Sequence, residues 1–151
     1  MSVFSRLFGE SPHRASHPVF GQLLFVKAKR GSYWECECIA DEKPLSVSIE
    51  APSGELPTDK QVEFYQRVVG NADATFQSAA PLLVPKYEAW VKRAFPSAWR
   101  DAFALAGISI PVDGQDTSEW DVSFECIADK SGHLFTCYFE GGNPTVVSID
   151  G

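Results

Sequence analysis

Three segments near the start of the chain are predicted to be strands, residues 22–29, 33–40 and 45–51, and in the second and third of them apolar and polar residues alternate with a period of two. Such alternation is typical of strands that have one buried face and one face in water. In the second segment Trp34, Cys36 and Cys38 fall on one side, and Glu35 and Glu37 fall on the other. Turn-forming stretches separate the segments, so the pattern predicts an antiparallel meander.

The same pattern returns at the end of the chain, over residues 120–128, 134–140 and 145–150. The pentapeptide Glu-Cys-Ile-Ala-Asp occurs in both regions, at residues 37–41 and 125–129, each time a few residues after a tryptophan. The two ends of the chain therefore predict related antiparallel meanders.

The middle of the chain has helical signals. Thr58 and Gln61 have the spacing of a capping box, and the apolar positions that follow predict a helix that ends at Gly70. A second helix is expected over residues 72–93, with a break or kink near Ala80 because it contains two prolines. A third is expected over residues 97–106, where a serine stands at the N-cap position.

This order predicts an α+β fold in which two antiparallel three-stranded β-meanders, N- and C-terminal and pseudo-repeated, flank two or three central helices. Residues 1–18 lack sustained periodicity and are expected to form a flexible N-terminal tail, which leaves residues 19–151 as a single α+β domain. The pattern leaves open whether the meanders join in one sheet or form two.

The net charge of −7 is concentrated near the C-terminus. Residues 1–108 contain 12 basic and 12 acidic side chains, whereas residues 109–151 contain one lysine and eight acids. An acidic surface repels a phosphate backbone and attracts a basic protein, so we expect a basic partner and no nucleic acid. The predicted partner-binding residues are Glu119, Asp121, Glu125 and Asp129. The alternative is an acidic surface that serves only solubility.

The cysteines and histidines do not predict a cofactor or metal site. Alternation places Cys36 and Cys38 on the apolar side of their strand, and Cys126 and Cys137 lie in register with phenylalanines, so core thiols are favoured over metal or redox use. His13 and His17 stand in the predicted tail, and His133 in a predicted turn. We therefore predict no catalytic residue and no cofactor, which favours a non-enzymatic role while an enzymatic one stays open.

Two other functions remain open. A metal-dependent hydrolase could use the carboxylates clustered at Asp113, Asp116 and Glu119, although their spacing matches no calcium-loop pattern. A self-associating structural domain, such as a homodimer, could pair an unpaired meander edge with a second copy. The absence of a long apolar run or a secretory leader predicts a cytoplasmic location without a membrane partner.

Several short motifs resemble small bacterial domains of unknown function. They are Phe20-Gly21-Gln22-Leu23 at the first strand, Trp34 in the second, Thr58 at the helix start, and Val147-Ser148-Ile149-Asp150-Gly151 at the end. Some relatives of these domains are immunity proteins of polymorphic toxin systems. The resemblance implies a single-domain cytoplasmic α+β protein that neutralises a toxin by binding it, and it assigns no catalytic residue.

Overall fold

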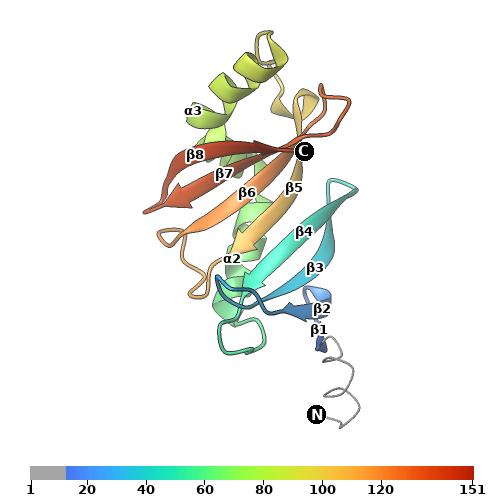
Figure 1. The fold of residues 1–151 in the computed structure, drawn as a ribbon, viewed down its shortest axis with the longest axis vertical. Coiled ribbons are helices and arrows are strands. Elements are labelled where there is room, and N and C mark those ends of the chain that lie inside the picture. Colours follow the sequence, from blue (N-terminus) through green and yellow to red (C-terminus); the bar gives the residue numbers. More distant parts are fainter. Residues whose placement is uncertain (1–12) are drawn as a thin grey trace.

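Eight strands form one mixed sheet in chain order, from β1 to β8, in the computed structural model, which describes residues 13–151 (Figure 1). All neighbouring strands are antiparallel except β4 and β5, which are parallel and are connected by helices α2 and α3. The elements are β1 (Arg14–His17), β2 (Gly21–Val26), β3 (Tyr33–Ala40), β4 (Lys43–Glu50), α2 (Asp59–Gly70), α3 (Ala72–Val91), β5 (Phe103–Ile110), β6 (Trp120–Cys126), β7 (Leu134–Glu140) and β8 (Asn143–Asp150).

The prediction of two three-stranded meanders that flank the helices is wrong, and the open question of one sheet or two is answered by a single sheet. Each meander has four strands, and the parallel pairing of β4 with β5 joins them into one sheet. β1 was missed because its sequence, Arg-Ala-Ser-His, has no apolar run, yet it pairs with β2 from Arg14↔Leu24 to His17↔Gly21. The remainder of the predicted tail, residues 1–12, lies outside the described residues.

The third predicted helix, residues 97–106, is also wrong. Only a single 3₁₀ turn forms there, at Trp99–Asp101, and the chain then enters β5. Phe103 and Leu105 are buried, but the register with β6 shifts between Leu105 and Gly107 before Ile108 becomes the next buried residue. This bulge interrupts the period of two, which explains why the pattern did not identify a central strand.

The helices α2 and α3, unlike the third predicted helix, form where the sequence predicts them. At the start of α2 the Thr58 hydroxyl accepts a hydrogen bond from the Gln61 N–H at 3.2 Å, and the Gln61 side chain accepts one from the Thr58 N–H at 3.0 Å, which confirms the capping box. α3 does not break at Ala80 but continues through Pro81 and Pro85. Both prolines are exposed and lie four residues apart, so the carbonyls they leave unpaired are on the solvent side of the helix.

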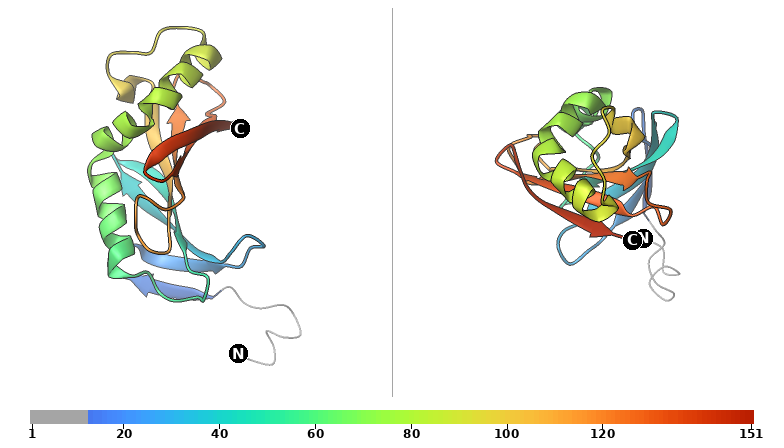
Figure 2. Two further views of the ribbon diagram at one scale, coloured as in Figure 1. Left: turned by 90° about the vertical axis from the view of Figure 1, so that its left-hand side faces the viewer. Right: turned by 90° about the horizontal axis from the view of Figure 1, so that it is seen from above.

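Both helices pack on one face of the sheet, and the opposite face is concave and uncovered (Figures 1 and 2). The covered face contains the aromatic core, in which Trp34, Phe64, Phe103 and Phe124 are fully buried. Phe76 stacks on Trp99 at a centroid distance of 5.0 Å and meets Phe124 edge to face at 6.1 Å. We call the other side of the sheet the open face.

The cysteines divide into two kinds. Cys126 and Cys137 are buried in the core, as predicted, whereas Cys36 and Cys38 are only half-buried. All four are free thiols. Within residues 13–151 no helix is long and apolar enough to cross a bilayer.

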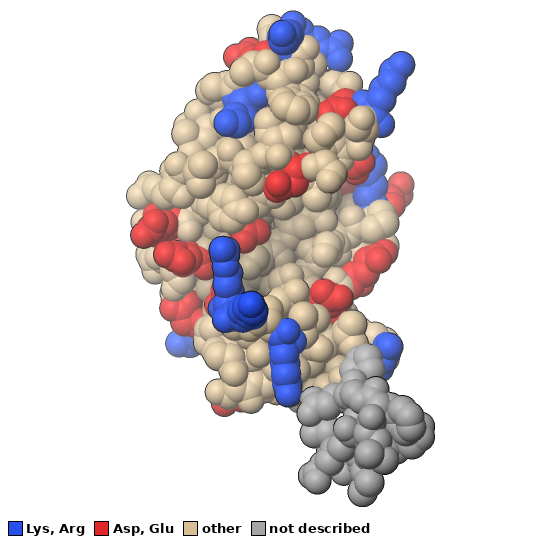
Figure 3. Space-filling view, in the orientation of Figure 1, with Lys and Arg blue, Asp and Glu red and all other residues tan. Residues whose placement is uncertain are grey.

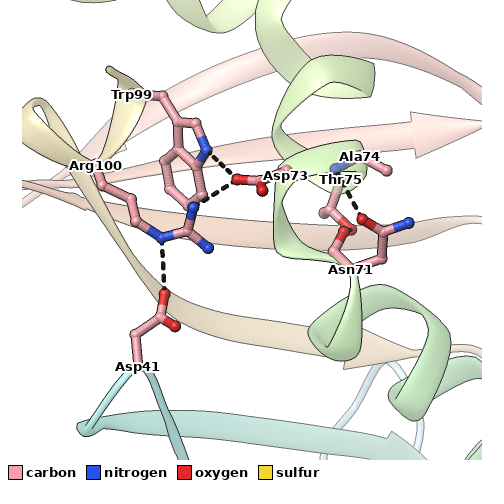
Figure 4. Close-up of polar contacts among 7 residues, drawn as sticks. All are labelled: Asp41, Asn71, Asp73, Ala74, Thr75, Trp99 and Arg100. Atoms are coloured by element: carbon pink, nitrogen blue, oxygen red, sulfur yellow. Dashed lines mark hydrogen bonds and ion pairs between the residues drawn. The ribbon is translucent and has the colours of Figure 1, made fainter.

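The repeated pentapeptide anchors a β-turn in both halves of the chain. Asp41, the last residue of the first copy, receives a hydrogen bond from Arg100, which also pairs with Asp73 at the start of α3 (Figure 4). Asp129, the last residue of the second copy, accepts a hydrogen bond from the Trp90 indole of α3 at 2.9 Å. In each half the aspartate therefore ties a turn of the sheet to the helical layer.

Candidate binding surface on the open face

Small polar residues form the floor of the open face. The strand register sets Ser46 of β4 opposite Gly107 of β5, Gly107 opposite Ser123 of β6, Ser123 opposite Thr136 of β7, and Thr136 opposite Ser148 of β8. One row across five strands thus consists of four hydroxyl residues and a glycine. The Ser123 and Thr136 hydroxyl oxygens lie 2.8 Å apart, within hydrogen-bond distance.

The neighbouring row adds carboxylates to the hydroxyls. It runs from Glu35 through Ser48 and Ser109 to Asp121 and ends beside Tyr138. Both rows lack large apolar side chains in the middle strands, where a sheet that packs against a second layer would have them. The centre of this face is therefore shallow, polar and accessible.

A hollow of about 570 Å³ lies over this second row, and its lining includes Arg30, Ser48, Glu50, Val112 and Asp121. An adjoining hollow shares Glu50 and Val112 with it and adds acidic side chains from the loop before β6 and the end of β7. We call the five carboxylates of these two hollows the acidic groove: Glu50, Asp113, Glu119, Asp121 and Glu140. In Figure 3, which looks onto the open face, acidic side chains lie on both sides of a hollow and basic side chains project at its lower rim.

Burial and mutual repulsion shape the ionisation of this groove. Burial raises the pKa of Asp121 to about 6, and the nearby Glu50 carboxylate adds to the increase. Burial also raises the pKa of Glu50, against the effect of a hydrogen bond from the Val112 N–H, while Asp113 and Glu119 raise it further. A positive charge placed in the groove would relieve this repulsion.

Asp113 is held as an anion by its own loop. The Ser118 hydroxyl donates to it at 2.7 Å and the Gln115 N–H donates at 3.0 Å, so its pKa lies below the ordinary value. The carboxylate remains exposed at the rim of the groove. The loop thus presents a fixed negative charge to the solvent.

Buried Gln61 of α2 positions the acidic groove from below. Its side-chain amide donates to the Glu50 carbonyl at 2.9 Å and to the Pro111 carbonyl at 3.1 Å, and so joins the end of β4 to the loop that follows β5. Gly114 tightens the same junction, since a Cβ at this position would lie 2.5 Å from the Lys60 carbonyl oxygen. Its φ of +65° also favours glycine.

The structure separates the four predicted partner-binding residues. Glu119 and Asp121 lie in the acidic groove. Glu125 is exposed farther along β6, close to Gly132 in the next turn. The Asp129 side chain is only 15% exposed, and its carboxylate is engaged by Trp90, by His133 and by the Ser131 N–H.

Two members of the groove were missed by sequence reasoning. Glu50 belongs to the half of the chain whose charges balance, and Glu140 lies at the far end of β7, so neither stood out. Only the parallel pairing of β4 with β5, which sets Ser48 beside Ser109, brings Glu50 close to Asp121. No signal in the sequence alone reports that pairing.

Metal ligation and known relatives give no further indication of chemistry. Among residues 13–151 no three His, Cys, Asp or Glu side chains converge on one point, so the hydrolase alternative at Asp113, Asp116 and Glu119 gains no support from the structure. No family model matches the chain, and no curated protein or solved structure matches it significantly.

Proposed function

We propose that this chain is a non-enzymatic protein-binding module whose acidic groove receives a basic segment of a protein partner. The observation that carries the proposal is the crowding of carboxylates on an uncovered, concave sheet face, where Glu50 adds to the raised pKa of Asp121 while Asp113 and Glu119 add to that of Glu50. Carboxylates in this situation gain when a lysine or arginine arrives, because the pairing replaces repulsion with charge-assisted hydrogen bonds.

The floor of the groove suits a polypeptide ligand. Ser48 and Ser109 are short and leave space above the sheet, and their hydroxyls both donate and accept hydrogen bonds. The surrounding carboxylates would guide the approach of a basic protein and make binding sensitive to salt. They would also repel a nucleic-acid backbone, so we propose a protein rather than a nucleic acid as the partner.

The resemblance to immunity-type bacterial domains suggests the kind of partner. A toxin with a basic surface, neutralised by direct binding in the cytoplasm, is consistent with an acidic binding face that has no catalytic machinery of its own. This assignment rests on the short motifs around Phe20, Trp34, Thr58 and the last five residues, together with the acidic groove.

Affinity capture from the source cell at low salt tests the proposal. The full chain serves as bait in four forms: wild type, Glu119→Lys, Glu140→Lys and, as the matched control, Glu63→Lys on the exposed side of α2. All three substitutions change the net charge equally, so only the location differs. We expect the partner to be lost with the two groove variants, retained with the control, and released from the wild type by added salt.

Either of two results would refute the proposal that the partner binds in the acidic groove. One is equal recovery of the partner with Glu119→Lys, Glu140→Lys and wild type. The other is an equal loss with the Glu63→Lys control, which would show that total charge rather than the groove governs capture. Circular dichroism of each bait confirms that the variants are folded.

Self-association is a second candidate, favoured by the edge of the sheet at β8. Within residues 13–151 no strand pairs with the outer edge of β8, and Val146 on this strand is 53% exposed. An unpaired strand of this length is a template for pairing with a second copy. Sedimentation at two concentrations tests this candidate, and a mass independent of concentration at the monomer value would remove it.

A further inference from the structure

Cys36 and Cys38 form an accessible pair of thiols on the helix-facing side of β3, away from the acidic groove. They are two residues apart on one strand, so their side chains point the same way, and their sulfur atoms lie 4.0 Å apart. β2 pairs with β3 only at Tyr33, Trp34 and Glu35, so the two cysteines lie just beyond this paired stretch. Both side chains are half-buried and therefore reachable from solvent.

A tyrosine from the helical layer accompanies the pair. The Tyr65 side chain of α2 lies near the Cys38 sulfur, and burial, followed by the interaction with Cys38, raises the pKa of the tyrosine. Burial, with a smaller contribution from Cys38, raises the pKa of the Cys36 thiol to about 12. Cys36 is therefore protonated at neutral pH, and a ligand that binds its sulfur has to displace a proton, which thiophilic metal ions do.

The geometry favours a shared ion over a disulfide. Two residues on the same face of a strand have Cα atoms about 6.6 Å apart, close to the upper limit of about 6.8 Å for disulfides. The sulfurs would also have to approach to about 2.05 Å. By contrast, two sulfurs that each bind one ion at about 2.3 Å in a linear arrangement are about 4.6 Å apart, and the observed 4.0 Å is much closer to this separation than to that of a disulfide.

The number of ligands narrows the choice of ion. The adjacent carboxylates, Glu35 and Glu37, point to the opposite face of the sheet, and among the described residues no third His, Cys, Asp or Glu joins the two sulfurs. Structural zinc requires four such ligands. A soft ion that accepts two thiolates fits the pair, and Cu(I) is one of the soft ions that thiolates select.

We propose that Cys36 and Cys38 bind a single thiophilic ion, Cu(I), in two-coordinate fashion. Each thiol loses its proton to solvent, two Cu–S bonds form, and the oxidation state of the metal does not change. The Tyr65 hydroxyl donates a hydrogen bond to the Cys38 thiolate and so offsets part of the negative charge that remains on the site. This proposal does not depend on the acidic groove, which lies on the other face of the sheet.

Anaerobic titration of the full chain with Cu(I), in competition with a chromophoric Cu(I) chelator, tests the proposal. We expect one tightly held ion per wild-type chain. The Cys36→Ser and Cys38→Ser variants should each weaken binding by more than the about 10–100-fold associated with loss of an outer-shell partner, because a ligand itself is removed. The Cys126→Ala variant, which removes a core thiol, should bind like wild type.

A second measurement needs no variant. Alkylation with iodoacetamide at alkaline pH, where a larger fraction of each thiol is ionised, followed by peptide mass spectrometry, should label Cys36 and Cys38 slowly in the metal-free protein and more slowly still after one equivalent of Cu(I). Failure of the wild type to take Cu(I) from the chelator would overturn the proposal. So would unchanged binding by the Cys36→Ser and Cys38→Ser variants, or alkylation of both cysteines at the same rate with and without the ion.

Discussion

The two faces of the sheet are built from the same strands but differ in almost every physical property. On β6, Val122 and Phe124 are fully buried against the helices, whereas Asp121 and Ser123 alternate with them on the open face. The covered face is packed with aromatic rings, and the open face has hydroxyls and carboxylates around a hollow. One face therefore holds the fold together and leaves the other free to evolve a binding surface.

The largest expected contrast between the faces is in stability. Phe124→Ala should lower the free energy of unfolding by about 3–5 kcal/mol, because it removes a buried ring and leaves a cavity. The matched change on the neighbouring residue, Ser123→Ala, should cost only about 1 kcal/mol, since it removes a single, partly buried hydrogen bond with Thr136. Urea unfolding monitored by tryptophan fluorescence measures both values. Similar losses of unfolding free energy in the two variants would show that the two faces do not differ in their contribution to stability.

The second largest effect on stability is expected at Gln61, which hydrogen-bonds the backbone that carries the acidic groove. Gln61→Ala should lower the free energy of unfolding by about 2–3 kcal/mol, because it leaves the Glu50 and Pro111 carbonyls without their shared donor in a buried position. Gln66→Ala, an exposed position on the same helix, is the control and should change the value by less than about 0.5 kcal/mol. Equal effects of the two substitutions would mean that Gln61 does not support the groove.

A smaller effect depends on pH. The folded-state pKa of Asp121, about 6, exceeds the unfolded value of about 3.9, so this group stabilises the fold below pH of about 4 and loses that contribution as the pH rises through about 6. Asp121→Asn should therefore raise the free energy of unfolding at pH 7. We expect about 1–2 kcal/mol once screening by solvent is allowed for.

The comparison of variant with wild type isolates this single group. The gain from Asp121→Asn should shrink as the pH falls from 7 to 4, because the wild-type carboxyl becomes protonated and resembles the amide. Denaturant unfolding at four or five pH values measures it. A gain that is constant over this range would show that the Asp121 carboxyl is not perturbed in the fold.

The sequence predicted individual elements better than their assembly. β3 and β7 have the predicted bounds, β3 because the alternation around Trp34 is uninterrupted and β7 because turn residues bound it on both sides, and the Thr58–Gln61 capping box correctly marked the start of α2. The first part of β5 was predicted as a helix because the bulge near Leu105 disrupts the alternation. The union of the meanders depends on the contact of β4 with β5, which is distant in sequence and leaves no local pattern.

In the candidate site, too, residues that stand out locally in the sequence were predicted, and residues that depend on contacts distant in sequence were not. Glu119 and Asp121 were identified from local acidity, and both lie in the groove. Asp129 came from the same acidic region, but local charge could not reveal that Trp90 and His133 engage its carboxylate. Glu50 was missed because its neighbours in space, unlike its neighbours in sequence, are acidic.

The most direct test of the central claim is a chemical-shift map of the ¹⁵N-labelled chain titrated with the captured partner. Our account predicts that the largest perturbations fall on the open face around Glu50, Val112, Glu119 and Asp121, and that they diminish as salt is added. Perturbations confined to α2 and α3, with the groove unchanged, would contradict it.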